Sequence, residues 1–310
     1  MPAIDIVLPV FAVMVVGWLF ARGGVIDQGG VKAISDFVFL LAVPALLFRT
    51  TAQGIGDGNV DPGLFQAYYL AAAINFFLAL FIGWKLLPVS GAERAVMTVA
   101  ATFSNAVLIG IPLVERAFGP DGLVPLLLLV SVHAMILLTA GTIAVEIARG
   151  AGNRLHTVVL STLKGVAKNP LIMSLLAGFL WHATGVPLPA MVDSFCSIVA
   201  TGAGPAALFA VGAGLAAYRL SGDLRHIVTL VGVKCLLMPL WVWLLATRVF
   251  DVRPDWVPVM VVMAALPIGA NASLFALRYG LYIQRATGAV FLSTLFSVLT
   301  LTVLIGIFRS

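Results

Sequence analysis

The sequence FSNAVLIGIP occupies residues 103–112, and the sequence LPIGANAS occupies residues 266–273. Each stretch lies inside a long apolar run and combines glycine, proline, asparagine and serine. Proline removes a helix donor and clashes with the preceding turn, while glycine permits unwound backbone. A plain proline kink would explain one such run, whereas two in corresponding places favour a pair of broken helices. We expect irregular backbone at residues 109–112 and 267–271, with the two irregular segments close together.

Composition places these runs in a membrane. The chain has 310 residues, of which 61% are hydrophobic and only 10% are charged. Soluble domains carry roughly a quarter charged residues, so a soluble surface is excluded. Lipid leaves only helices or closed barrels as spanning structures, and the long continuous apolar runs predict an all-α membrane protein. The net charge of +5 is spread between these runs, so we expect no nucleic-acid partner.

Ten apolar runs are long enough to be read as spans, since a helix of about 20 residues crosses a bilayer core. The expected spans are residues 4–22, 32–53, 64–87, 94–118, 122–148, 169–184, 190–217, 225–247, 255–279 and 284–308. The longest polar connection, residues 150–168, divides the chain into two halves of five spans. We expect domains at 1–149 and 169–310, joined by a cytoplasmic linker.

Basic residues set the expected orientation, because cytoplasmic loops are enriched in Lys and Arg. If the N-terminus is outside, twelve of the 18 Lys and Arg residues lie inside and five lie outside, with Lys234 inside a span. This asymmetry predicts that both termini face outward.

The two halves repeat each other. A shift of 161 residues places Pro9 on Pro170, Gly17 on Gly178, and residues 44–48 (PALLF) on residues 205–209 (PAALF). Because each half has an odd number of spans, the second copy must be inverted. Inverted repeats are a known transporter architecture, in which the site lies near the bilayer midplane between the copies.

Two buried polar residues add to the expected chemistry. Helix N-termini exposed at the breaks would favour an anion. Lys234 lies well inside the eighth span, where a cation is costly and usually functional. It could pair with an anionic substrate, take the place of a coupling cation or titrate; snorkelling to the surface is the structural alternative. His133, in the fifth span, could carry protons or be a satisfied core histidine.

Motifs for other classes of function are missing from the sequence. It contains no nucleotide-binding loop, zinc-binding helix or serine elbow. We therefore expect no enzymatic activity, no cofactor and no metal site.

Several motifs resemble the auxin efflux carrier family. They are residues 8–10 (LPV), 17–19 (GWL), 37–39 (FVF), 44–48 (PALLF), Asn105 with residues 110–114 (GIPLV), and 169–171 (NPL). The resemblance implies ten helices in a five-plus-five inverted repeat, similar to bile-acid sodium symporters, with crossing, broken fourth and ninth helices. It also implies a scaffold of spans one, two, six and seven, and a homodimer built on it. The short middle loop fits the bacterial branch, and thus a cytoplasmic membrane.

The resemblance also assigns site residues and a substrate class. By carry-over, Asn105, Pro112, Pro267 and Asn271 belong to the crossover site. Gly110 and Ser273 of the same interrupted spans, with His133 and Lys234, complete the expected substrate-binding set. Family members move organic anions, so we expect a secondary transporter of a small carboxylate, such as a malate- or malonate-like dicarboxylate or an auxin-like acid. The alternatives are an anion channel, distinguished by its conductance, and a membrane-bound ligand sensor, which would not translocate its ligand.

Overall fold

Helices form every named element in the part of the chain that the structure describes. The computed structural model describes residues 2–54, 60–150, 168–218, 220 and 222–309; the expected linker at 150–168 lies almost wholly outside them. The α-helices are α1 (Ala3–Arg22), α2 (Gln28–Phe37), α3 (Val43–Ala52), α4 (Gly63–Lys85), α5 (Gly91–Thr102), α6 (Ile111–Ala148), α8 (Pro170–Ala183), α9 (Ala190–Thr201), α10 (Ala203–Leu215), α11 (Leu224–Gly232), α12 (Met238–Arg248), α13 (Val257–Ala265), α14 (Ala270–Tyr279) and α15 (Ile283–Arg309). Three π-helical turns are η1 (Val38–Ala42), η2 (Ala106–Gly110) and η4 (Val233–Leu237).

Seven continuous helices among the described residues are long and apolar enough to cross a membrane. They are Ala3–Arg22, Gln28–Ala52, Gly63–Lys85, Ala106–Ala148, Ala190–Leu215, Leu224–Arg248 and Ile283–Arg309. The expectation of an all-α membrane protein is thereby confirmed. Fewer than ten qualify because α5, α13 and α14 are pieces of interrupted runs, α8 has 14 residues, and α6 joins two expected spans across Gly119 (φ 74°).

Three prolines inside the long helices are each preceded by a π-turn. Turns η1, η2 and η4 each end two residues before a proline, at Pro44, Pro112 and Pro239. In each turn the last bond runs from an N–H to the carbonyl five residues back, as from Ile111 to Ala106. A wider turn relieves the clash between the proline ring and the carbonyl four residues back. These helices therefore continue through their prolines.

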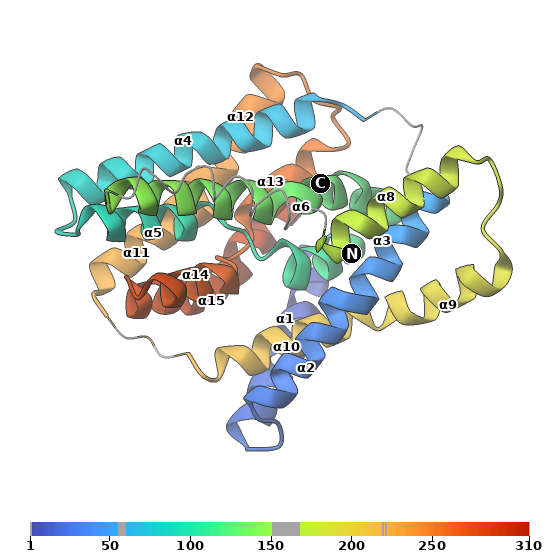
Figure 1. The fold of residues 1–310 in the computed structure, drawn as a ribbon, viewed down its shortest axis with the longest axis horizontal. Coiled ribbons are helices and arrows are strands. Elements are labelled where there is room, and N and C mark those ends of the chain that lie inside the picture. Colours follow the sequence, from blue (N-terminus) through green and yellow to red (C-terminus); the bar gives the residue numbers. More distant parts are fainter. Residues whose placement is uncertain (1, 55–59, 151–167, 219, 221, 310) are drawn as a thin grey trace.

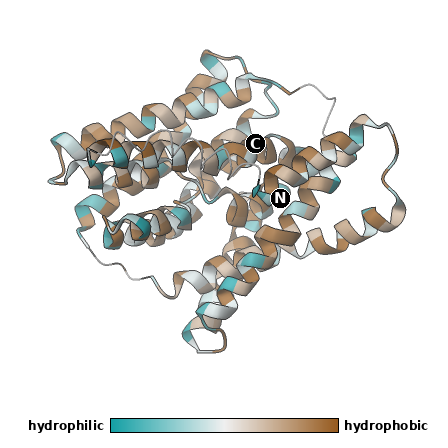
Figure 2. Ribbon diagram, in the orientation of Figure 1, coloured by the Kyte–Doolittle hydropathy of each residue, from teal (hydrophilic) through white to brown (hydrophobic). Residues whose placement is uncertain are grey.

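The helices form two groups (Figure 1). In one group α1 packs on α10 and α3 on α8 and α9; in the other α4, α5 and α6 pack with α11 to α15. Hydrophobic residues dominate along the helices, and hydrophilic ones gather mainly toward helix ends and loops (Figure 2). Large apolar side chains such as Met191 and Ile198 of α9 are 85% and 76% exposed. A bilayer would cover such side chains without cost.

Two close glycine contacts in the first group are related to each other by the 161-residue shift. A Cβ atom at Gly17 of α1 would lie 2.2 Å from the carbonyl oxygen of Phe209 in α10. A Cβ atom at Gly178 of α8 would lie 2.8 Å from the carbonyl oxygen of Phe48 in α3. Adding 161 to 17 gives 178, and adding it to 48 gives 209, so the shift converts one contact into the other with the partners exchanged. Such reciprocity is the mark of a twofold relation.

The two ends of the chain lie together. The Arg309 guanidinium donates to the carbonyl of Ala117 (2.6 Å), and that of Arg116 donates to the carbonyl of Asp5 (3.2 Å). The start of α1, the end of α15 and the first turns of α6 thus share one side of the molecule.

Candidate functional site

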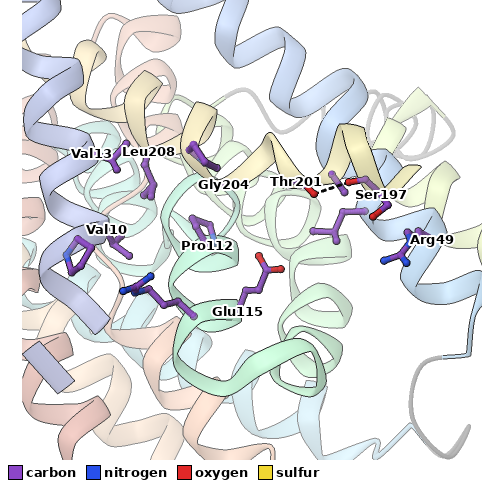
Figure 3. Close-up of a pocket in the computed structure, with 14 residues that line it drawn as sticks. Val10, Val13, Arg49, Pro112, Glu115, Ser197, Thr201, Gly204 and Leu208 are labelled. Carbon is purple, nitrogen blue, oxygen red and sulfur yellow. Dashed lines mark hydrogen bonds between the residues drawn. The ribbon is translucent and has the colours of Figure 1, made fainter. Parts of the chain in front are cut away.

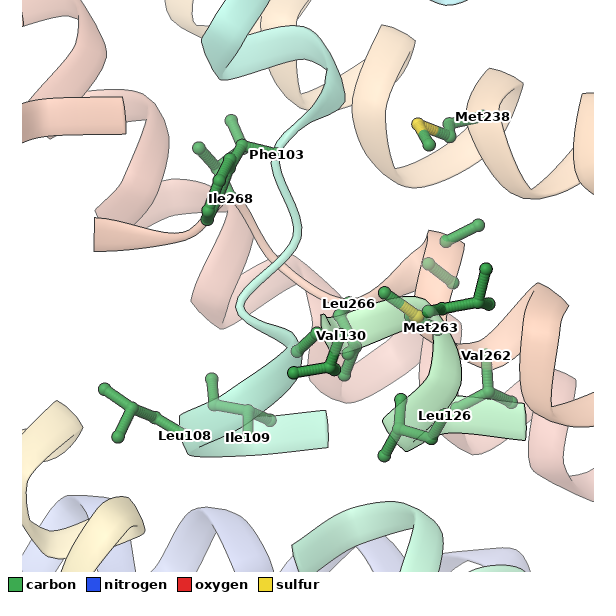
Figure 4. Close-up of a cluster of buried hydrophobic side chains, with 14 of the residues drawn as sticks. Phe103, Leu108, Ile109, Leu126, Val130, Met238, Val262, Met263, Leu266 and Ile268 are labelled. Carbon is green, nitrogen blue, oxygen red and sulfur yellow. The ribbon is translucent and has the colours of Figure 1, made fainter. Parts of the chain in front are cut away.

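Two irregular segments meet at the centre of the second helix group. Residues 103–105 separate α5 from η2, and residues 266–269 separate α13 from α14. They run antiparallel: the Asn105 N–H donates to the carbonyl of Pro267 (3.0 Å), and the Gly269 N–H donates to that of Phe103 (3.0 Å). Ser104 and Ile268 form the bridge between them, and Figure 4 shows the two segments side by side among buried apolar side chains.

The first of these breaks is not where the sequence placed it. Residues 109–112 continue the helix through η2 into α6, because the π-turn accommodates Pro112. The chain unwinds six residues earlier, at residues 103–105, where there is neither glycine nor proline. The second break is at residues 266–269, so the expectation was correct for Pro267 and Gly269, while Asn271 lies in the first turn of α14.

Side chains from the following helices bind the amides of the two bridging residues. The Ser104 N–H donates to Nε2 of His133 in α6 (3.1 Å). The Ile268 N–H donates to Oγ of Ser293 in α15 (3.0 Å). Both breaks are buried, where an unpaired N–H is costly, so these two side chains make the irregular backbone tolerable.

Side chains from the preceding helices bind the carbonyls at the breaks. Asn75 of α4 donates through Nδ2 to the carbonyl of Ala101 (2.6 Å), near the end of α5. Lys234 of η4 donates through Nζ to the carbonyls of Ala264 (2.5 Å) and Leu266 (3.0 Å), at the end of α13. The last carbonyls of a helix have no partner within it and carry partial negative charge. A buried cation is well placed there.

A cavity of about 510 Å³ opens beside the breaks; we call it the break cavity. Its lining residues are Ser35, Phe39, Leu40, Phe103, Ser104, Asn105, Ala106, Val107, Leu108, Val130, His133, Ala134, Asn169, Pro170, Leu171, Gly269, Ala270, Asn271 and Leu274. The N-terminus of the helix Ala106–Ala148 and that of α14 both contribute to its wall. Among the described residues, no side chain caps the first N–H groups of either helix.

A second cavity, of about 490 Å³, lies on the side of the two chain ends; we call it the terminal cavity. It is lined by residues of α1, α3, α6, α9 and α10, and Figure 3 shows Pro112, Glu115, Arg49 and Gly204 among them. The Arg49 guanidinium is paired with Asp193 of α9 at 2.7 Å. The start of the helix Ala106–Ala148 lies between the two cavities, with Leu108 lining one and Pro112 the other.

A known protein family matches nearly the whole chain. The membrane transport protein family matches residues 2–305 of the chain.

The chain belongs to the membrane transport protein family.

This membership confirms the resemblance to the auxin efflux carriers that the sequence motifs indicated. A "Putative malonate transporter" of Rhizobium meliloti is 28% identical over 315 residues, covering 98% of this chain and 95% of the relative. "Uncharacterized transporter YfdV" of Escherichia coli is 25% identical, covering 94% and 93%. The mouse "Lysosomal cholesterol signaling protein" is 23% identical over 94% of this chain but only 36% of its own length. The protein is thus an integral membrane transporter with a small-molecule substrate, and its relatives give no indication of an enzyme.

The structure brings three of the eight expected site residues together on the break cavity: Asn105, His133 and Asn271. Pro267 lies within the second break, where its carbonyl binds Asn105. Pro112 lines the terminal cavity instead. Gly110 and Ser273 are buried in η2 and α14 and line neither cavity; a Cβ at Gly110 would lie 2.8 Å from Cδ1 of Leu266.

Lys234 lies behind the second break and does not line the break cavity. Its side chain is fully buried, so snorkelling to the membrane surface is ruled out for this conformation. Its partners are the α13 carbonyls.

Four other polar residues of the site were not expected from the sequence. They are Ser104 and the three buried side chains of Tyr68, Asn75 and Ser293. The Tyr68 hydroxyl lies 3.3 Å from Oγ of Ser104. Tyr68 and Asn75 are polar residues inside an apolar run, as Lys234 is, and that was the available signal. The described residues include no group of three or more His, Cys, Asp or Glu side chains arranged to hold a metal ion.

Proposed function

We propose that this protein is a secondary active transporter of a small organic anion, a carboxylate of the malonate-like dicarboxylate or auxin-like class, and that it works by alternating access. The observation that carries the proposal is the break cavity, whose wall contains two uncapped helix N-termini. Its volume is that of a small-molecule site. The family, and the name of the Rhizobium meliloti relative, point to the same class of substrate.

The electrostatics of the break cavity favour an anion. Each helix N-terminus carries a partial positive charge and free N–H donors. The side-chain amides of Asn105 and Asn271 stand beside these two ends, and none of the lining residues is acidic. A carboxylate bound here would find donors from two opposed helices. A substrate with a second carboxylate would use both ends.

The placement of the two cavities supports the proposal of alternating access. The break cavity and the terminal cavity lie on either side of the start of the helix Ala106–Ala148, between the two helix groups. We propose that the second group moves against the first and exposes the breaks to one side at a time. The reciprocal contacts of Gly17 and Gly178 support a five-plus-five inverted repeat of ten spans, with the breaks crossing in the fourth and ninth.

The rest of the arrangement is proposed from the charge count and the family. Both termini face outward from a bacterial cytoplasmic membrane, and the first helix group forms a homodimer. The shared side of the two chain ends agrees with an even number of spans.

Lys234 has a positioning role in this proposal. Unwound carbonyls and helix C-termini bind coupling cations in other secondary transporters. Here the Lys234 ammonium occupies such carbonyls, those of Ala264 and Leu266. The cation that stabilises the second break is therefore part of the chain.

The test is uptake of radiolabelled carboxylates by proteoliposomes, using acetate, malonate, malate and indole acetate with and without proton and sodium gradients. Saturable uptake of at least one acid is expected. Asn271→Asp places a negative charge at the N-terminus of α14 and should raise KM by at least about tenfold, whereas Asn271→Gln stays neutral and should change it less. No uptake of any acid, or equal KM values in both variants, would contradict the proposal. Currents far above carrier rates in a bilayer recording would favour the anion channel.

A further inference from the structure

The hydrogen bond between Ser104 and His133 determines which nitrogen of the imidazole carries the proton. A backbone N–H can only donate, so Nε2 of His133, 3.1 Å from the Ser104 nitrogen, must offer a lone pair. An imidazole with one unprotonated nitrogen is neutral, and its hydrogen is then on the other nitrogen, Nδ1. While the first break keeps this bond, His133 is a neutral Nδ1–H tautomer.

The remaining donor of this ring has no partner among the described residues. Nδ1 of His133 is buried and makes no hydrogen bond to any described residue. The side chain is only 3% exposed, and the residue lines the break cavity. A buried donor left unpaired is costly and needs an explanation. The break cavity borders this side chain, so a ligand that reached Nδ1 from there would supply the missing acceptor.

The matching side chain of the second break has no such spare group. Ser293 accepts from Ile268 through Oγ and donates its own hydrogen to the carbonyl of Val290 (3.0 Å). Ser293 does not line the break cavity. The unused donor at His133 is therefore not required for holding a break, since a fully satisfied serine performs the same task.

We infer that His133 donates its Nδ1 hydrogen to a carboxylate oxygen of the substrate, and that it acts in transport as a fixed hydrogen-bond donor rather than as a proton carrier. This inference rests on the proposed function and names one ligand of the proposed site. Protonation of Nε2 would break the bond to Ser104 and free a buried amide of the first break. The same bond that orients the ring thus opposes its use as a relay.

Neighbouring elements fix the ring in place. Phe103 packs against it with ring centroids 4.9 Å apart, and Tyr68 of α4 meets it at 5.9 Å. The Tyr68 phenol on α4 is a titratable group that packs against the ring. The Lys234 ammonium lies behind the second break, bound to the α13 carbonyls. Neither bonds to Nδ1.

The first test reads the tautomer directly. Solid-state ¹⁵N spectra of histidine-labelled protein in liposomes distinguish a protonated from an unprotonated ring nitrogen, and His133→Gln identifies the His133 signals among the four histidines of the chain. At pH 7 the expected state is Nδ1–H with bare Nε2, and malonate should shift the Nδ1 signal. An Nε2–H or doubly protonated ring would overturn the inference whatever transport shows.

The second test separates donation from proton transfer, using radiolabelled malonate and proteoliposomes. His133→Gln can accept from Ser104 and retains a donor but cannot titrate, so uptake should fall less than in a variant methylated at Nδ1 and keep the wild-type pH profile. Nδ1-methylhistidine at position 133 keeps the bare Nε2 and loses the donor, so uptake should fall by about tenfold or more. Thermal unfolding of the same variant measures how far the added methyl group disturbs the packing.

Three results would count against the inference. Loss of proton-gradient dependence in His133→Gln would make the ring a proton carrier. Full uptake by the methylhistidine variant would remove the donor role. The third result is the absence of malonate uptake by the wild type although the spectra show the expected tautomer. It would refute malonate as the substrate and as the acceptor of the Nδ1 hydrogen, but the tautomer assignment would remain valid.

Discussion

The two breaks pose the same backbone problem, and the protein solves it differently in each half. Each break follows a helix whose last carbonyls need donors from a neighbouring helix. At the first, the neutral amide of Asn75 binds the Ala101 carbonyl; at the second, the cation of Lys234 binds those of Ala264 and Leu266. The two breaks therefore have similar backbone hydrogen bonding, but the side chain that donates to it is neutral at the first break and charged at the second.

The side chains that accept from the backbone N–H groups of the two breaks also differ, and here the first break has the unusual residue. His133 at the first break lines the break cavity and has a donor to spare, while Ser293 at the second is satisfied and lies outside it. Both breaks border the break cavity, but only the first has a side chain with a spare donor on it, while Lys234 binds the second break from outside the cavity. The two breaks thus have similar backbone geometry, and they differ in a few side chains that give each break its own hydrogen-bonding groups and charge.

The comparison predicts the largest effect at Lys234. Lys234→Met removes the donors of two buried carbonyls, each worth about 1–3 kcal/mol when left unpaired, but also relieves the burial of a charge. The unfolding temperature should therefore change only slightly, because the two effects on stability oppose each other. Malonate uptake should fall by at least about tenfold. Lys234→Arg should keep part of the activity.

Malonate uptake and thermal unfolding in detergent measure this effect. Lys32→Met is the control, because Lys32 is exposed and is paired with Asp36 one turn away. Full uptake with unchanged gradient dependence in Lys234→Met would remove Lys234 from the mechanism.

A smaller effect is expected at the corresponding neutral donor. Asn75→Leu keeps the branching at Cγ, although its methyl groups are bulkier than the amide, and it leaves the Ala101 carbonyl without its amide donor. The lost donor should cost about 1–3 kcal/mol in the free energy of unfolding. Uptake should fall by about threefold to fivefold, less than in Lys234→Met. The measurement is the same pair of assays, and a larger loss for Asn75→Leu would reverse the ranking of the two breaks.

Ser293→Ala tests the side that we regard as only structural. It leaves the Ile268 N–H unpaired and should lower stability by about 1 kcal/mol. The malonate KM should stay within about twofold, because Ser293 does not line the break cavity. A KM increase comparable with that of a methylated His133 would show that Ser293 also contributes to ligand binding.

The smallest effect is expected for Tyr68→Phe. The hydroxyl lies 3.3 Å from Oγ of Ser104, a long contact, and the ring packing on His133 is retained. Stability should change by less than about 1 kcal/mol and uptake by less than about twofold. A large change in the pH dependence of uptake would instead assign a proton-transfer role to the phenol.

The sequence was most informative where a residue type has one dominant physical effect. Apolar run length predicted the membrane helices, and Pro267 with Gly269 located the second break. The first break was displaced by six residues because a proline was taken as the point of unwinding, whereas the π-turn before Pro112 absorbs it.

Long-range partners were beyond the sequence. The sequence shows that the buried Lys234 ammonium needs partners. It does not show that the fold places the ammonium beside carbonyls 30 and 32 residues away. Tyr68 and Asn75 were missed for the same reason: their partners are Ser104, in the first break, and Ala101, near the end of α5.

The π-turns before Pro44, Pro112 and Pro239 have a consequence for how these helices are drawn as wheels. A π-turn holds one residue more than an α-turn, so everything beyond it is rotated by about 100° relative to an uninterrupted α-helix. A stripe of side chains traced at constant pitch from α11 into α12 would therefore jump to another face at η4. Any lipid-facing or partner-facing surface assigned by periodicity must be reset at each of these three turns.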